Sequence, residues 1–205
     1  MAINLAEFGK MGFFAGLIQN DFANACLLSR RAICTRNAGR GSGAYLANEW
    51  NVQYIVFEGK QDLLRRLQMR IRGWQLPNSF FLVLCDQDAQ DCKCLKSQIA
   101  MMLLATGKTT KIRIACHELE NFYLGDLVAV AKGLSCSSVD RLASKSIYRQ
   151  PDLIANAPDQ LKRITGNAYQ NCSGSRAIAP YLDLSGGNRS NSFNALLSAI
   201  RELTT

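Results

Sequence analysis

The chain has 205 residues, of which 48% are hydrophobic and 20% are charged, and its formal net charge is +8. This length and apolar content suffice to bury one core and exclude a disordered chain. The longest apolar runs, Phe80–Cys85 and Ile99–Ala105, are too short to cross a bilayer, and no secretory signal opens the chain, so we expect a cytoplasmic protein without membrane contact.

The first fifty residues carry few clear signals. A short strand is predicted at Ile3–Glu7, and an apolar helix is predicted at Met11–Ile18. Residues 19–51 show no clear period and include a glycine-rich loop, so we interpret them as a divergent insertion or connection.

From residue 52 onward, predicted strands and helices alternate. The predicted elements are a strand at Val52–Phe57, a helix after Gly59 that runs to Ile71, a strand at Phe80–Cys85, a helix from Leu95 to Leu103, a strand at Lys111–Cys116, a helix at Leu119–Ala131 and a closing helix at Phe193–Leu203. The continuous apolar run of Phe80–Cys85 is typical of a strand buried on both faces of a parallel sheet. Alternation of this kind predicts an α/β fold. We expect one domain over residues 1–205, with a mainly parallel central sheet, helices on both faces and a C-terminal extension at 133–205.

Acidic residues follow three of the predicted strands. Glu7 ends the first, Asp86 and Asp88 follow Phe80–Cys85, and Glu118 and Glu120 follow Lys111–Cys116. In an open α/β sheet the chemistry gathers at the carboxyl ends of the strands. Clustered carboxylates repel one another unless a cation neutralises them, and oxygen ligands of this type select Mg²⁺ or Mn²⁺. These residues therefore predict a metal site.

Two alternatives stay open for the acids. Any single acid at a strand end is also a candidate helix cap, since Asp favours that position, and Asp91 and Asp126 belong to the same groups. Glu58 is the alternative to Glu7 as the glutamate that follows an early strand.

A glutamate after an early strand and an Asp-x-Asp pair after a later one resemble the TOPRIM signature of topoisomerases, primases and OLD-type nucleases. The chain resembles more closely a family of bacterial TOPRIM-like proteins that are often encoded beside ABC- or SMC-type ATPases in anti-phage defence loci. The resemblance extends over about residues 52–201, and its segments are Gly59–Leu64, Leu84–Asp88, Ile114–Glu120, Tyr148–Asp152, Arg176–Pro180 and Asn188–Phe193.

The acids and this resemblance together lead us to expect a Mg²⁺- or Mn²⁺-dependent nuclease that hydrolyses phosphodiester bonds of DNA or RNA. Asp86 and Asp88 would hold the metal, with Glu118 and Glu120 as further ligands. Glu7 would be a ligand or the general base that accepts a proton from the attacking water. The resemblance implies an effector subunit that works with a separate ATPase.

The basic residues indicate how a polyanion would bind. Lys and Arg outnumber acids ten to five in residues 1–78 and nine to five in 127–205, whereas 79–126 carries five against six. Basic flanks around an acidic centre suit a nucleic acid held over a cation site, although an ordinary solvated surface has the same pattern. The expected phosphate contacts are Lys60, Lys96, Arg113 and Arg189.

We also expect a partner protein, and we keep two alternative functions. The chain lacks a phosphate-binding loop, because Met102 stands where Gly107-Lys-Thr-Thr110 would need a glycine, so ATP hydrolysis would come from the partner. The helices Met11–Ile18 and Phe193–Leu203 are candidate docking surfaces or ordinary core helices, and an oligomer is possible. The other functions are a non-catalytic adaptor that binds nucleic acid and an ATPase, and a metal-dependent nucleotide-processing enzyme.

Overall fold

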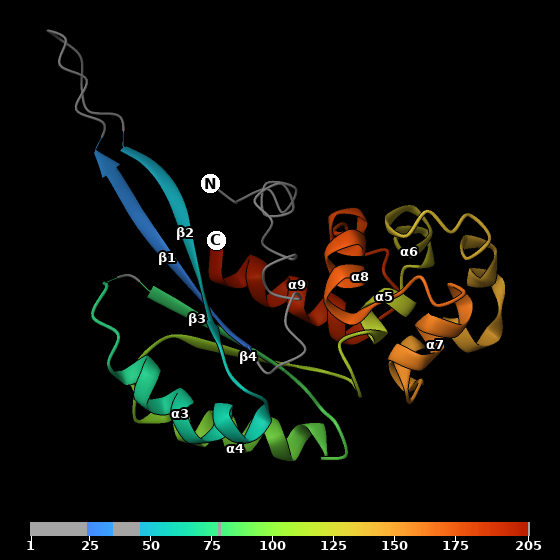
Figure 1. Ribbon diagram of the computed structural model, residues 1–205. Helices are drawn as coiled ribbons and strands as arrows, with labels where there is room; N and C mark the ends of the chain where they lie inside the picture. The colour runs from blue at the N-terminus through green and yellow to red at the C-terminus, as the bar shows by residue number, and fades with distance from the viewer. Residues whose placement is uncertain (1–23, 35–45, 78, 205) are drawn as a thin grey trace, which may run out of the picture.

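A four-stranded sheet carries helices on both faces in the computed structural model, which describes residues 24–34, 46–77 and 79–204 (Figure 1). The predicted strand Ile3–Glu7, the helix Met11–Ile18 and the site residue Glu7 lie outside the described residues. The strands are β1 Asn24–Cys34, β2 Leu46–Val56, β3 Ser79–Asp86 and β4 Thr110–Ala115. The helices are α3 Lys60–Arg72, α4 Cys92–Leu104, α5 Asn121–Leu124, α6 Leu127–Gly133, α7 Ala157–Ile164, α8 Asn171–Ile178 and α9 Asn191–Thr204, with short 3₁₀ turns η1 Asp140–Ser144, η2 Ser146–Arg149, η3 Pro151–Leu153 and η4 Ala179–Tyr181.

The sheet has the order β2-β1-β3-β4, and its pairing corrects one expectation. β3 and β4 are parallel, but β1 is antiparallel to both β2 and β3, so the described sheet is mixed rather than mainly parallel. The difference comes from β1, which lies within the residues 19–51 that we interpreted as an insertion or connection. Ser29, Arg30 and Arg31 interrupt the apolar residues of this strand and hide its period.

Three strands end at the same edge of the sheet. Because β2 and β3 are both antiparallel to β1, and β4 is parallel to β3, the strands β2, β3 and β4 point the same way. In the register, Val56 pairs with Asn24, and Asn24 pairs with Leu84. Asp86 is the last residue of β3 and Glu58 follows β2 by two residues, so both lie at the same end of the sheet, with β1 between their strands. We call this side of the sheet the carboxyl edge.

α3 and α4 cover one face of the sheet. Their buried leucines and isoleucines recur at helical spacing, as the sequence predicted, and they contact alternate residues of β3. The core on this face includes Leu63, Leu67 and Ile71 of α3, Leu95, Ile99 and Leu103 of α4, and Phe81, Val83 and Cys85 of β3. Leu82 and Leu84 face the opposite core, so the prediction that this strand is buried on both faces is confirmed.

The helices of residues 121–204, which include α9, form the larger core on the other face of the sheet. Segment 133–205, which we expected to extend the domain, is an integral part of this core. α9 buries Phe193, Leu196, Leu197 and Ile200, so the interpretation of this helix as a core element is confirmed, and these apolar side chains are not exposed for docking. No helix in the described part of the chain is long and apolar enough to cross a bilayer.

The predicted helix Leu119–Ala131 is two shorter helices, α5 and α6. The break falls at Gly125 and Asp126, where the Asp126 carboxylate caps α6 by accepting the Ala129 N–H at 3.0 Å. A Cβ atom at Gly125 would lie 2.0 Å from Asn188 Oδ1 and 2.8 Å from Ser190 N, so only glycine fits this close approach. The break is a tertiary feature, because the segment that presses on Gly125 lies about sixty residues further along the chain.

Candidate functional site

Asp86 is the last residue of β3 and the most perturbed acid at the carboxyl edge. Its Oδ1 atom is buried and has no hydrogen-bond partner among the described residues. Burial and the nearby charges of Glu120, Asp88 and Glu118 raise the pKa of Asp86 to about 8, whereas Lys60 lowers it. A buried carboxyl without a partner, surrounded by other carboxylates, is a favourable place for a cation.

Lys60 connects the start of α3 to the Asp-x-Asp pair. Its Nζ atom lies 2.5 Å from Asp88 Oδ2 and donates a hydrogen bond of 2.9 Å to the Gln87 carbonyl oxygen. The Lys60 side chain is 15% exposed and that of Asp88 58% exposed. Lys60, which we expected to contact phosphate, therefore neutralises Asp88 in this structure.

The turn after β3 is also tied to the turn after β4. The Asp88 N–H donates to the His117 carbonyl oxygen at 3.1 Å, and the His117 N–H donates to Gln87 Oε1 at 3.2 Å. Asp88 and His117 both have left-handed backbones, with φ of 51° and 57°. These hydrogen bonds hold the Asp-x-Asp pair close to the Glu118–Glu120 segment.

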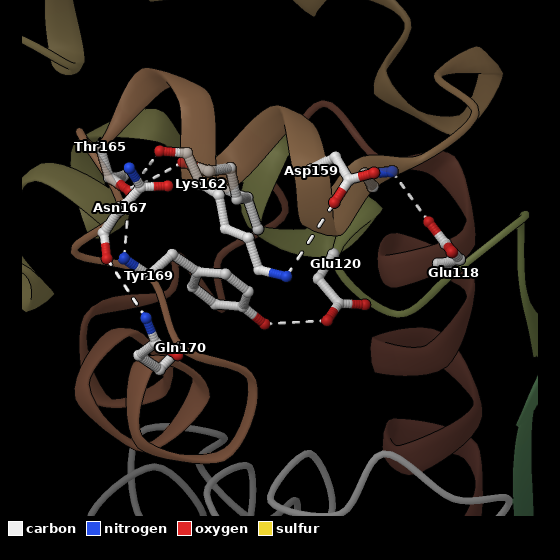
Figure 2. A network of polar contacts seen from close by, with 10 residues as sticks. Glu118, Glu120, Asp159, Lys162, Thr165, Asn167, Tyr169 and Gln170 are labelled. Carbon is white, nitrogen blue, oxygen red and sulfur yellow. Dashed lines mark hydrogen bonds and ion pairs between the residues drawn. The ribbon is translucent and has the colours of Figure 1, made fainter.

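Glu118 and Glu120 each have a partner in the helical region (Figure 2). Glu118 Oε2 accepts the backbone N–H of Ala157, the first residue of α7, at 2.8 Å. Glu120 is 8% exposed, and its Oε1 accepts the hydroxyl of the fully buried Tyr169 at 2.9 Å. Burial and the charge of Glu120 raise the pKa of Tyr169, which keeps this hydroxyl a hydrogen-bond donor.

The predicted ligand set does not converge on one point in this structure. Within residues 24–34, 46–77 and 79–204, no three His, Cys, Asp or Glu side chains are placed so that they could hold a metal ion together. Glu118 and Glu120 are directed at α7 and Tyr169, and Asp88 is paired with Lys60. Asp86 is the acid of the predicted set whose carboxyl keeps a buried oxygen without a partner.

Glu58 is the glutamate that the register places at the carboxyl edge. It follows β2 by two residues, its side chain is exposed, and its backbone N–H donates to Asp62 Oδ2 at 3.1 Å. Asp62 is buried and pairs with Arg65 and Arg66, so it fixes the turn between β2 and α3. The alternative that we kept beside Glu7 therefore lies at the carboxyl edge, at the end of the strand order away from β4.

Two of the four residues predicted to contact phosphate, Arg113 and Arg189, form hydrogen bonds to backbone carbonyl oxygens within the protein. Arg113 donates to the carbonyl oxygens of Ala195 and Ile112 at 2.8 and 2.9 Å, which attaches α9 to β4. Arg189 donates to the carbonyl oxygen of Ala143. Lys96, by contrast, is exposed on α4 and makes no hydrogen bond or ion pair within the described chain.

Replacing Arg189 with alanine is expected to lower stability by about 1–2 kcal/mol, because its hydrogen bond to a backbone carbonyl is removed, which corresponds to a fall in Tm of roughly 3–6 °C. The Lys96→Ala variant is the control and should melt within about 1 °C of wild type, since Lys96 is solvated. Thermal melting measures both variants, and an Arg189→Ala variant as stable as wild type would return this residue to the phosphate-binding candidates.

The helix-cap alternative is confirmed for Asp91 and Asp126. Asp91 accepts the Cys94 N–H at 2.8 Å at the start of α4, and Asp126 caps α6. The sequence analysis missed Asn121 and Tyr169, which position the Glu118–Glu120 segment. Asn121 accepts the nearby Glu118 N–H at 3.2 Å, but the partners that hold Asn121 and Tyr169 in the interior lie thirty or more residues away in the chain, so no local pattern marks these two residues.

The carboxyl edge thus gathers Asp86, Asp88, Glu58 and Lys60, with Glu118 and Glu120 close enough to influence the charge of Asp86. This arrangement offers a cation the carboxylates of Asp86 and Asp88, with a further carboxylate, Glu58, at the same edge. Comparisons with protein-family models, with curated proteins and with solved structures found no match for this chain.

Proposed function

We propose that the protein is a Mg²⁺- or Mn²⁺-dependent nuclease of TOPRIM-like type that hydrolyses phosphodiester bonds at the carboxyl edge. The observation that carries the proposal is the Asp86 carboxyl, which has a buried oxygen without a partner in the described part of the chain and a pKa of about 8 among three other carboxylates. A divalent cation bound here would stabilise the ionised form of Asp86, which among the described residues is favoured by the charge of Lys60.

The residues present fit such an ion. Mg²⁺ is usually held by one or two carboxylates together with water and substrate phosphate, so a complete protein cage is not required. Asp86 and Asp88 would hold the ion. Asp88 is more than half exposed, and its partner Lys60 is an ammonium that a cation can replace. The ion supplies charge stabilisation to the phosphate and activates water.

The remaining residues of the edge have separate roles in this proposal. Glu58 is exposed at the same edge of the sheet and would accept the proton of the attacking water. Lys60, once released from Asp88, would carry a positive charge next to the phosphate. Glu118 and Glu120 are positioned by Ala157 and Tyr169, and they add negative charge around Asp86 rather than direct ligands.

A non-catalytic adaptor is the second candidate function. The observation in its favour is that Glu118 and Glu120, like the capping acids Asp91 and Asp126, have structural partners. An adaptor would bind nucleic acid without metal and would tolerate the loss of Asp86. The separate ATPase implied by the resemblance fits both functions, and co-expression followed by size-exclusion chromatography tests it.

The experiment that separates these functions is a cleavage assay on labelled duplex DNA, single-stranded DNA and RNA, with Mn²⁺, with Mg²⁺ and with EDTA. We expect cleavage that requires metal, and a loss of at least about a hundredfold in the Asp86→Asn and Glu58→Gln variants. Asp91→Asn is the matched control: it removes a carboxylate close in sequence that only caps a helix, so its activity should stay within about threefold of wild type.

Three results would contradict the nuclease. They are cleavage that persists in EDTA, equal activity in Asp86→Asn and wild type, and hydrolysis confined to mononucleotides. The last result would identify a nucleotide-processing enzyme instead. Metal-induced stabilisation without cleavage of any substrate would favour the adaptor.

A further inference from the structure

The outer face of α3 and α4 is strongly basic. We infer that this helix-pair face, defined by Arg65, Arg70, Arg72, Lys93 and Lys96, binds the phosphate backbone of a nucleic acid and directs it to the carboxyl edge. The inference rests on the proposed function in taking nucleic acid as the substrate, and it adds the surface that holds it.

The two helices carry far more positive than negative charge. α3 and α4 together contain seven Lys and Arg residues and one acid, Asp62, which gives them a net charge of +6. Residues 121–204 are more than three times as long and carry nine Lys and Arg against six acids, a net charge of +3. A polyanion is therefore attracted to the helix pair more strongly than to the helical region.

Asp62, the acidic residue within α3 and α4, is buried and adds little negative charge to the surface. Asp62 is 6% exposed and is neutralised by Arg65 and Arg66. Arg70 and Arg72 at the end of α3 are exposed and make no hydrogen bond or ion pair with any described residue. Arg65 thus has a carboxylate partner, whereas Arg70 and Arg72 have none among the described residues that would compete with phosphate.

Helix geometry aligns two of the α3 charges and brings the two α4 charges close together. Arg65 and Arg72 lie two turns apart on one side of α3, and Lys93 and Lys96 lie one turn apart on α4. The helices pack side by side beneath the sheet (Figure 1). α3 has 13 residues and is about 20 Å long, which is the length of about six base pairs.

Both helices begin at the carboxyl edge. Lys60, the first residue of α3, contacts Asp88, and α4 starts directly after Asp91. The positive ends of the two helix dipoles therefore lie at this edge, where they favour an anion. A strand of nucleic acid on the helix-pair face would reach Asp86 without crossing the helical region.

A binding experiment tests the inference without catalysis. The face variant carries Arg70→Gln, Arg72→Gln, Lys93→Gln and Lys96→Gln, and the matched control carries Arg141→Gln, Lys145→Gln, Arg149→Gln and Arg176→Gln. Each set removes four exposed cations and lowers the net charge from +8 to +4. Glutamine keeps high helix propensity, and a Tm within about 3 °C of wild type verifies folding. Fluorescence anisotropy with a fluorescein-labelled 20-base-pair duplex and its single strand, in EDTA at 50 and 200 mM salt, measures affinity.

The expected result is at least a tenfold weaker affinity of the face variant, and less than about a threefold change in the control. The slope of log affinity against log salt should become shallower by about 0.9 for each duplex phosphate that the variant no longer neutralises. Equal reductions in both variants, a larger reduction in the control, or no binding by wild type at 50 mM salt would overturn the inference. A wild type that binds through this face and cleaves nothing in Mn²⁺ would refute the nuclease and leave the inference intact.

Discussion

Replacing Asp86 with asparagine is expected to raise the Tm of the metal-free protein by about 5 °C at pH 8.5 and to leave it unchanged at pH 4. The pKa of Asp86 is raised to about 8 in the folded protein, mainly by burial, against about 3.9 in an unfolded chain. Between these values the folded state holds a proton that the unfolded state releases, so the wild type loses stability as pH rises from about 4 to about 8. Asparagine does not titrate and avoids this loss.

The size of the shift follows from the same comparison. One pKa unit corresponds to about 1.4 kcal/mol, and solvent near the partly exposed Asp86 reduces the effect, so about 2 kcal/mol remains. For a chain of this length, that is several degrees in Tm. Melting curves at half-unit steps between pH 4 and pH 8.5 provide the measurement, and parallel Tm profiles of wild type and variant would show that Asp86 has an ordinary pKa.

The same variant tests the metal. A ligand that binds only the folded state stabilises it, by about 2.7 kcal/mol at a hundred times its Kd. Mn²⁺ should therefore raise the Tm of the wild type, and more at pH 8 than at pH 5, because protons compete for Asp86 at the lower pH. Asp86→Asn should show no such shift, and Asp91→Asn should keep it. An equal shift in Asp86→Asn would place the ion elsewhere.

The Asn121→Ala variant is expected to lose about 3–5 kcal/mol of stability and about 10 °C in Tm. Asn121 is fully buried, and its Nδ2 donates to the carbonyl oxygens of Pro151 and Ile154 at 2.6 and 2.9 Å. Its Oδ1 accepts the Glu118 N–H at 3.2 Å. Each polar group left without a partner in the interior costs about 1–3 kcal/mol.

Two further variants make this prediction specific. Asn121→Asp keeps the size and the acceptor but loses both donors, so it should be at least as unstable as Asn121→Ala. Gln98→Ala, on the exposed side of α4, should change stability by less than about 0.5 kcal/mol. A stable Asn121→Asp protein would show that the two carbonyls need no donor from this side chain.

The local pattern of apolar residues was sufficient to predict the elements in which that pattern is regular or continuous. The continuous apolar run of β3 and the leucine spacing of α3 and α4 depend on neighbours in the chain, and the structure confirms them. The same patterns located Asp86 and Asp88 at a strand end. The strand β1 was not predicted, because polar residues interrupt its apolar pattern. Only its pairing with β2 and β3 makes this segment a strand.

The sequence by itself determined that the chain combines strands and helices, that β3 is buried on both faces and that the Asp-x-Asp pair follows this strand, because each depends on periodicity over a few residues. Only the tertiary structure decided which acids keep a free carboxyl. Glu118 and Glu120 are directed at Ala157 and Tyr169, which lie about forty to fifty residues further along the chain. Long-range interactions of this kind, together with burial, set the charge of Asp86, and no local pattern records them.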